Sequence, residues 1–209
     1  MDTVRIQNII FDLGGVIVNI DPQLTARAFA ALSGTEPVDI MELHKSANFF
    51  TAYETGKITD NQFRDEIRKF LMKKDIPDEK IDQAWGALLL DIPEEKIQML
   101  SHARDQYNTY LLSNTNHIHR LKFCRTFHNL TGRKLDEYFE KVYYSYEMGK
   151  RKPDEDIFIQ VIDENKLVPE RTLLIDDSLP NIETARSLGI QTLHVERNQV
   201  MIDLNANGR

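Results

Sequence analysis

The chain has 209 residues, of which 41% are hydrophobic and 28% charged, and its formal net charge is −7. This composition is typical of a globular protein with a substantial core. The negative charge argues against nucleic acid or an anionic membrane as partner, because clustered Lys and Arg bind such phosphates. The apolar run at residues 9–18 is interrupted by Asp12 and is too short to span a bilayer. We therefore expect a cytoplasmic protein with no membrane partner.

Five short apolar segments rich in β-branched residues predict strands. In chain order they are residues 6–11, 109–112, 142–144, 172–175 and 192–195. Helical spacing lies between them, as in the pattern over 179–188, which ends at Gly189. Strand and helix in alternation predict an α/β fold with a doubly wound parallel sheet, whose active crevice lies beyond the carboxyl ends of the strands.

The stretch between the first two expected strands, from about residue 21 to residue 92, contains only helix signals. Asp21 followed by Pro22 is typical of a helix start. Thr59 with Gln62 predicts a capping box. A crossover normally needs only about a dozen residues. We therefore expect an inserted α-helical cap subdomain at residues 18–93, and a core domain built from residues 1–17 and 94–209.

The single cysteine, Cys124, excludes an intrachain disulfide and a cysteine zinc site. It lies in an expected helix, which favours an inert thiol over a nucleophile.

Asp12 directly follows the first expected strand, in the sequence FDLGGV. A carboxylate at the end of an apolar strand is costly to bury without a partner. A functional acid and an Asp that caps the next turn are about equally favoured by this position alone.

Two further segments place small polar or basic residues after strands. In LSNTN, Ser113 and Asn114 are suited to hold an anion near a helix N-terminus, although a helix N-cap at Ser113 or Thr115 is the commoner use of such residues. In GKRKPD, Pro153 restricts Lys152 to an extended backbone and is expected to begin the next helix. Taken alone, Lys152 is more typical of a solvated surface lysine than of a phosphate contact.

Asp176 and Asp177 end the fourth expected strand, and Asn181 follows closely. Adjacent carboxylates repel each other unless a cation neutralises them, and Mg²⁺ prefers oxygen ligands of this kind. A metal site is favoured here over a pair of helix-capping acids. Together with Asp12, Ser113 and Lys152, these residues supply a nucleophile, an anion holder, a cation and a metal site, which phosphoryl transfer requires.

The order and spacing of these segments resemble the haloacid dehalogenase-like hydrolase superfamily over nearly the whole chain. The inserted helices stand where that superfamily has its type-one cap. The segments FDLGGVIV, LSNTN and GKRKP, with YETGKI in the cap, are most similar to the α-glucose-1-phosphatase-like branch. The resemblance implies a Mg²⁺-dependent phosphatase acting on a small phosphorylated metabolite, with a sugar phosphate expected and a sugar 1-phosphate favoured.

The resemblance also implies a role for each residue. Asp12 attacks phosphorus and forms an aspartyl-phosphate, while Ser113, Asn114 and Lys152 bind the substrate. The implied metal ligands are Asp12, the backbone carbonyl of Gly14, Asp177 and, either as a ligand or as an outer partner, Asp176. Asn181 is implied to hold a metal-bound water.

Gly14 departs from the pattern of most phosphatases of the superfamily, which carry there an Asp that acts as general acid and base. Losing such a group typically costs about 10²–10⁴-fold in rate. The branch resembled here also tends to have glycine at this place. We therefore expect anomeric, acyl or aryl phosphates, whose leaving groups need little protonation, to react faster than alkyl phosphates. Alternatively, His44 or Glu54 of the cap donates the proton, although each is more commonly a surface or structural side chain.

Three other functions are open to this sequence, and one of them, a phosphomutase, usually needs the acid and base Asp that Gly14 replaces. A non-catalytic phosphate-binding or regulatory protein is the main alternative, because Gly14 removes the usual proton donor. A dehalogenase shares the fold and the attacking Asp. Dehalogenases need no metal and carry an aromatic residue where Gly14 stands, so Gly14 and the acidic pair at Asp176 and Asp177 argue against this function.

Overall fold

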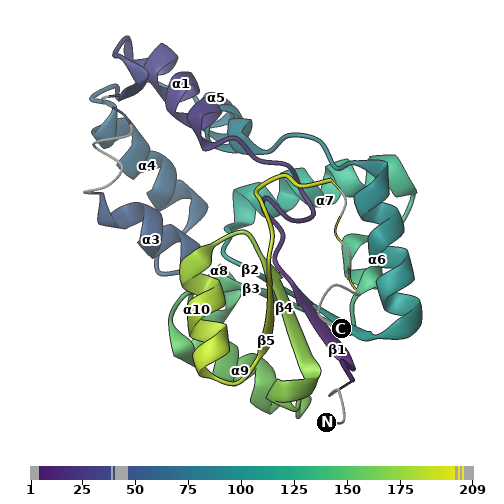
Figure 1. Cartoon of the computed structure of the whole chain (residues 1–209). Helices are drawn as coiled ribbons and strands as arrows, with labels where there is room; N and C mark the ends of the chain where they lie inside the picture. The colour runs from purple at the N-terminus through teal and green to yellow at the C-terminus, as the bar shows by residue number, and fades with distance from the viewer. Residues whose placement is uncertain (1–4, 39, 41–46, 201, 203, 205–209) are drawn as a thin grey trace.

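The computed structural model describes residues 5–38, 40, 47–200, 202 and 204. The strands in this part of the chain form one parallel sheet in the order β3-β2-β1-β4-β5 (Figure 1). They are β1 (Asn8–Phe11), β2 (Asn108–Ser113), β3 (Lys141–Tyr144), β4 (Thr172–Asp176) and β5 (Gln191–His194). All five expected strands and the α/β fold class are confirmed.

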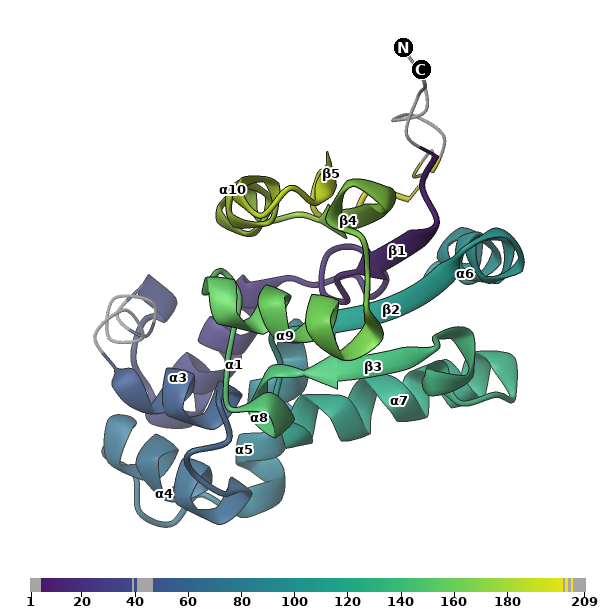
Figure 2. The same cartoon turned by 90° about the horizontal axis from the view of Figure 1, so that it is seen from below.

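Helices cover both faces of the sheet, which explains why the strands read as continuous apolar runs. The core helices are α6 (Glu94–Gln106), α7 (His117–Thr131), α8 (Ser145–Met148), α9 (Glu155–Asn165) and α10 (Leu179–Ser187), with short 3₁₀ turns η2 (Leu135–Tyr138) and η3 (Pro169–Arg171). Ile9 and Ile175 pack with the face that α6 and α7 cover, and Ile10 and Leu174 pack with α9 and α10 (Figure 2). Cys124 lies in α7, and burial raises the pKa of its thiol, in agreement with an inert role.

The topology reverses beside β1. The chain runs from β1 through β2 to β3 on one side and then returns to add β4 and β5 on the other. Phe11 lies level with Ile175 in the parallel register, and the Asp12 N–H donates to the Ile175 carbonyl at 2.9 Å. Asp12 and Asp176 therefore leave the sheet side by side, at the switch point where doubly wound folds bind their ligands.

The described segment between β1 and α6 is helical. Its elements are α1 (Pro22–Ser33), α3 (Asn48–Glu54), α4 (Asp60–Phe70), α5 (Asp78–Trp85) and the 3₁₀ turn η1 (Gly86–Leu88). The Asp21 cap of α1 and the capping box of Thr59 and Gln62 on α4 are both present, as predicted. These helices have their own apolar cluster, separate from the two clusters that flank the sheet. We propose that they form the cap at residues 18–93.

Two neighbouring linkers connect these helices to the core. The Asn19 N–H donates to the Asp91 carbonyl at 3.0 Å, and the Leu90 N–H donates to the Asn19 carbonyl at 2.9 Å. The buried ammonium of Lys96 donates to the Asn19 side chain at 2.8 Å. The helices thus join the core through one hydrogen-bonded pair of strand-like segments.

None of the described helices is both long enough and apolar enough to cross a membrane.

Phe63→Ala is expected to destabilise the helices between β1 and β2. Phe63 is fully buried, with its ring centroid 4.1 Å from Tyr53 and 5.0 Å from Trp85. Truncating a buried Phe leaves a cavity and costs about 3–5 kcal/mol. Urea unfolding followed by the fluorescence of Trp85, the chain's one tryptophan, measures this loss. Leu121→Ala on α7, where the side chain is exposed, is the control and is expected to cost no more than about 0.5 kcal/mol. Equal losses for the two variants would contradict the prediction.

Candidate active site

A buried ion cluster lies at the carboxyl end of the sheet. The Lys152 ammonium donates to Asp12 Oδ1 at 2.8 Å and to Asp176 Oδ2 at 2.7 Å. Lys152 is only 1% exposed, and Asp176 is fully buried. The interpretation of Lys152 as a solvated surface lysine is therefore wrong, because the fold encloses its side chain between two carboxylates.

The charges of this cluster are interdependent. Burial raises the pKa of Asp12 to about 7, although the Lys152 charge opposes the shift. Burial also lowers the pKa of Lys152, but the two carboxylates outweigh this effect, and the net shift is upward. Lys152 is thus a permanent cation. A second cation beside Asp12 would lower the pKa of that carboxyl and favour the ionised form that a nucleophile needs.

Asn114 fixes the backbone that carries Lys152. Its side-chain amide donates to the Lys152 carbonyl at 2.8 Å, and its oxygen accepts from the Lys152 N–H at 2.8 Å. This pairing fixes the backbone of Lys152, which lies in a turn rather than in the extended segment that we expected. Helix α9 begins only at Glu155, two residues after Pro153, where we expected the helix to start. The amide of Asn114 thereby positions Lys152. Its expected contact with substrate stays a prediction.

Asp176 is held by donors on every side. Its Oδ1 accepts from the Ser178 N–H at 2.8 Å, and the Asn181 amide donates to both oxygens at 2.9 and 3.0 Å. With the Lys152 bond added, this carboxylate is saturated with hydrogen bonds. Asp176 can therefore orient the Lys152 ammonium without itself binding a metal ion. Asn181 supports Asp176, and its expected contact with a metal-bound water stays a prediction.

Asp177 lies beside the loop that follows β1. Its Oδ2 accepts from Arg197 Nε at 2.7 Å. Gly15 has a φ of +82°, and a Cβ there would stand 2.6 Å from Asp177 Oδ2. Only glycine therefore permits the close approach of this loop to the end of β4.

The three carboxylates form a candidate metal centre. Oxygen atoms of Asp12, Asp176 and Asp177 all lie within 4.8 Å of one another. Among the described residues, none donates a hydrogen bond to the Gly14 carbonyl, so this oxygen is free to serve as a further ligand. A set of hard oxygen donors fits Mg²⁺ better than a softer metal.

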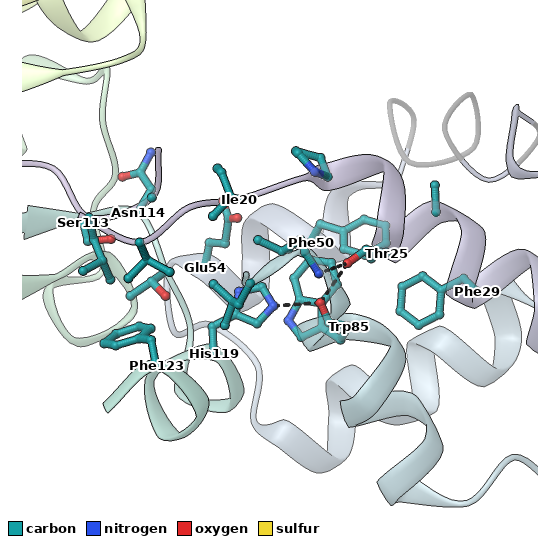
Figure 3. A pocket seen from close by; sticks show the side chains of 18 of the residues that line it. Ile20, Thr25, Phe29, Phe50, Glu54, Trp85, Ser113, Asn114, His119 and Phe123 are labelled. Atoms are coloured by element: carbon teal, nitrogen blue, oxygen red, sulfur yellow. Dashed lines mark hydrogen bonds between the residues drawn. The ribbon is translucent and has the colours of Figure 1, made fainter. Parts of the chain in front are cut away.

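A pocket of about 420 Å³ opens beside the ion cluster, between the cap helices and the sheet (Figure 3). Gly14, Ser113 and Asn114 line its end nearest the sheet. Asn116, rather than Ser113 or Thr115, caps α7, since its side chain accepts from the His119 N–H at 3.1 Å. Ser113 is therefore not used as a helix cap.

The far end of the pocket is mostly apolar, and its polar groups are paired with one another. Figure 3 shows Phe29, Phe50, Thr25 and Trp85 together there. The Thr25 hydroxyl donates to the Trp85 carbonyl at 2.9 Å. Walls of this kind exclude water from a reacting centre.

Three residues of this region had no clear signal in the sequence. Arg197 and Asn198 follow β5, and the Asn198 side chain bonds both the N–H and the carbonyl of Ile20, at 2.8 and 3.0 Å. Ser145 Oγ accepts from the Thr115 N–H at 2.9 Å and donates to the Glu54 carbonyl at 2.6 Å. These contacts fasten both linker and cap to the core. His44, one of the expected proton donors, lies outside the described residues.

Comparison with known proteins gives consistent matches. The model of a family described as haloacid dehalogenase-like hydrolase matches residues 6–189. A D-ribitol-5-phosphate phosphatase from Bacteroides thetaiotaomicron is 31% identical over 96% of this chain and 100% of its own length. A phosphorylated carbohydrates phosphatase from Thermotoga maritima is 24% identical, over 89% and 83%. The solved structure of a HAD family enzyme from Bacteroides thetaiotaomicron, in complex with magnesium and inorganic phosphate, is 38% identical with a TM-score of 0.86, and the match covers 93% of this chain and 96% of that one.

Asp12→Asn is expected to stabilise the metal-free protein more at pH 8 than at pH 5. The pKa of Asp12 rises from 3.8 to about 7 on folding, so native stability falls as the pH rises through this range. Asparagine has no charge to bury and avoids this loss. Since one pKa unit corresponds to about 1.4 kcal/mol, the gain at pH 8 exceeds that at pH 5 by on the order of 2–3 kcal/mol.

Urea unfolding in EDTA at the two pH values measures this difference. Asp105→Asn, which changes an exposed acid on α6, is the matched control and is expected to show no such dependence. A gain for Asp12→Asn that is the same at both pH values would contradict the prediction.

Proposed function

Because the chain belongs to the haloacid dehalogenase-like hydrolase family, we propose that it is a Mg²⁺-dependent phosphatase that hydrolyses a small phosphomonoester through Asp12. The observation that carries the proposal is the buried Lys152 between Asp12 and Asp176, with Asp177 close enough to share a metal. A cation and a metal site on either side of one carboxylate supply the charge neutralisation that phosphoryl transfer depends on.

Each residue has a defined task in the proposed reaction. The Asp12 carboxylate attacks phosphorus in line with the leaving group, and the resulting aspartyl-phosphate is then hydrolysed by water. Lys152 and Ser113 hold the transferring phosphoryl oxygens. Asp12, Asp177 and the Gly14 carbonyl hold Mg²⁺, which when bound offsets the negative charge of the phosphoryl group. Asp176 orients the Lys152 ammonium toward this group.

We propose a sugar phosphate as the substrate, with a sugar 1-phosphate favoured. The two relatives are a D-ribitol-5-phosphate phosphatase and a phosphorylated carbohydrates phosphatase, which supports the broader class of sugar phosphates. Gly14 offers no acid next to the nucleophile. The anomeric oxygen of a sugar 1-phosphate is a better leaving group than an ordinary alcohol and needs less protonation. A phosphorylated metabolite of this kind agrees with the expected cytoplasmic location.

The alternative is a regulatory protein that binds Mg²⁺ and a phosphoester without turnover. Only Gly14 favours it, since every other part that the proposed reaction needs has a candidate residue among those described.

Native protein is expected to release phosphate from p-nitrophenyl phosphate and from sugar 1-phosphates with Mg²⁺, and to lose this activity in EDTA. Asp12→Asn removes the nucleophile and is expected to reduce turnover at least about 10⁴-fold. Phosphate release in a stopped assay measures both effects, and Asp105→Asn serves again as the control with native activity. Mg²⁺ binding by native protein without turnover of any ester would support the regulatory alternative.

Glucose 1-phosphate is expected to have a higher kcat/KM than glycerol phosphate, by about 10-fold or more. The reason is that the alkoxide released from glycerol phosphate is the more basic leaving group and depends more on protonation. Steady-state kinetics on the two esters under the same conditions tests this. Comparable kcat/KM values would contradict the leaving-group argument while leaving the phosphatase function intact.

A further inference from the structure

The proposed reaction lacks a proton donor next to the nucleophile. In-line attack by Asp12 places the leaving oxygen on the far side of phosphorus, away from the sheet. On that side lies the 420 Å³ pocket, with Gly14 and Ser113 at its inner end. Any side chain that protonates the leaving group must therefore reach into this pocket.

Among the described residues that line the pocket, the ionisable side chains are Glu54 and His119. His119 Nε2 lies 3.0 Å from the Trp85 carbonyl, and Nδ1 lies 3.1 Å from the Asn116 amide. The carbonyl can only accept, so Nε2 carries the proton and Nδ1 accepts from the amide. Burial lowers the pKa of His119 to about 4. The ring is therefore neutral and both its nitrogens are occupied.

Glu54 lies between the two ends of the pocket. It is the last residue of α3, and Figure 3 shows its side chain between Ser113 and Asn114 on one side and Phe50 and Trp85 on the other. The side chain is 25% exposed. Its backbone carbonyl accepts from Ser145 Oγ at 2.6 Å, so a core residue anchors this end of the cap helix.

The one charged partner of Glu54 in the described structure comes from the loop that carries the catalytic lysine. Arg151 NH2 lies 3.4 Å from Glu54 Oε2, and Arg151 precedes Lys152 in the chain. The Nε of Arg151 is buried and has no hydrogen-bond partner among the described residues. Arg151 thus places a positive charge beside the carboxylate that forms when Glu54 gives up a proton.

We propose that Glu54 is the general acid and base of this phosphatase, and supplies from the cap the function that Gly14 cannot. This inference rests on the proposed function. In the first step Asp12 Oδ bonds to phosphorus, the P–O bond to the leaving group breaks, and the Glu54 carboxyl proton passes to the leaving oxygen. In the second step Glu54 takes a proton from water as that water attacks phosphorus. The P–O bond to Asp12 then breaks, which frees inorganic phosphate and restores both carboxyl groups.

The electrostatics of Glu54 suit this role. Burial raises the pKa of its carboxyl, and the nearby Arg151 charge only partly opposes the shift. A raised pKa increases the protonated fraction near neutral pH, where a general acid must hold its proton. Because Glu54 belongs to the cap, the donor is in place only when the cap covers the core. Proton transfer is thereby coupled to the exclusion of water.

The test is Glu54→Gln, compared on esters with leaving groups of different basicity. Hydrolysis of glycerol phosphate is expected to fall about 10²–10⁴-fold, since both of its steps lose their proton carrier. With p-nitrophenyl phosphate the first step needs no acid. Rapid mixing is therefore expected to show a burst of one p-nitrophenolate per active site, followed by a steady-state rate reduced by at least about 10²-fold. The preference for glucose 1-phosphate over glycerol phosphate is expected to steepen in this variant.

Glu66→Gln, which changes a partly exposed acid on α4 that pairs with Lys69, is the matched control and is expected to retain native kinetics. Glu54→Asp keeps a carboxyl and is expected to restore part of the glycerol phosphate rate. Native kinetics in Glu54→Gln, or equal losses in the burst and in glycerol phosphate turnover, would overturn the role of Glu54 alone. No turnover by native protein, or turnover unaffected by Asp12→Asn, would overturn the proposed function and this inference with it.

Discussion

The burial of one ammonium group between two carboxylates is the constraint around which the active end of this protein is built. Lys152 is enclosed together with Asp12 and Asp176. Leaving any one of these charges buried without a partner would cost several kcal/mol. The cluster therefore holds only if the ends of β1 and β4 and the loop after β3 stay in register. The parallel pairing of β1 with β4 meets this requirement, because it brings Asp12 level with Asp176.

The surrounding contacts fix the positions of the charged groups in this cluster. Asn114 fixes the backbone of Lys152, Asn181 fixes the carboxylate of Asp176, and Gly15 lets Asp177 approach. The cluster carries two carboxylates against a single ammonium. Burial is the main cause of the raised pKa of Asp12, and the neighbouring Asp176 charge adds to it. A bound divalent cation would neutralise the excess negative charge of the cluster. The metal-free protein thus holds Asp12 in an environment that destabilises its charged form, and a bound metal would relieve this. Such a loss of stability in favour of activity is common in active sites.

Much of this arrangement was predictable from the sequence, for a physical reason. Parallel strands end at one edge of a sheet, so residues placed just after them, such as Asp12, Ser113 and Asp176, must gather there. The burial of Lys152 was not predictable from its own position, because the polar segment GKRKPD is typical of a surface loop. Its enclosure depends on Asn114, a contact across 38 positions that no local pattern encodes. The placement of Glu54 likewise depends on how separate helices pack against the core.

The two linkers to the cap have a consequence for how such a protein diversifies. Asn19 and Asp91 are hydrogen-bonded neighbours although the whole helical segment lies between them. A segment whose ends meet is an insertion at one point of the sheet's connectivity, and its length and sequence are not constrained by the distance between β1 and β2. Mutation and recombination within it leave the strand ends where they are. Exchange of this one contiguous stretch of chain can therefore replace the pocket walls, and with them Glu54, while Asp12, Ser113 and Lys152 keep their places at the end of the sheet.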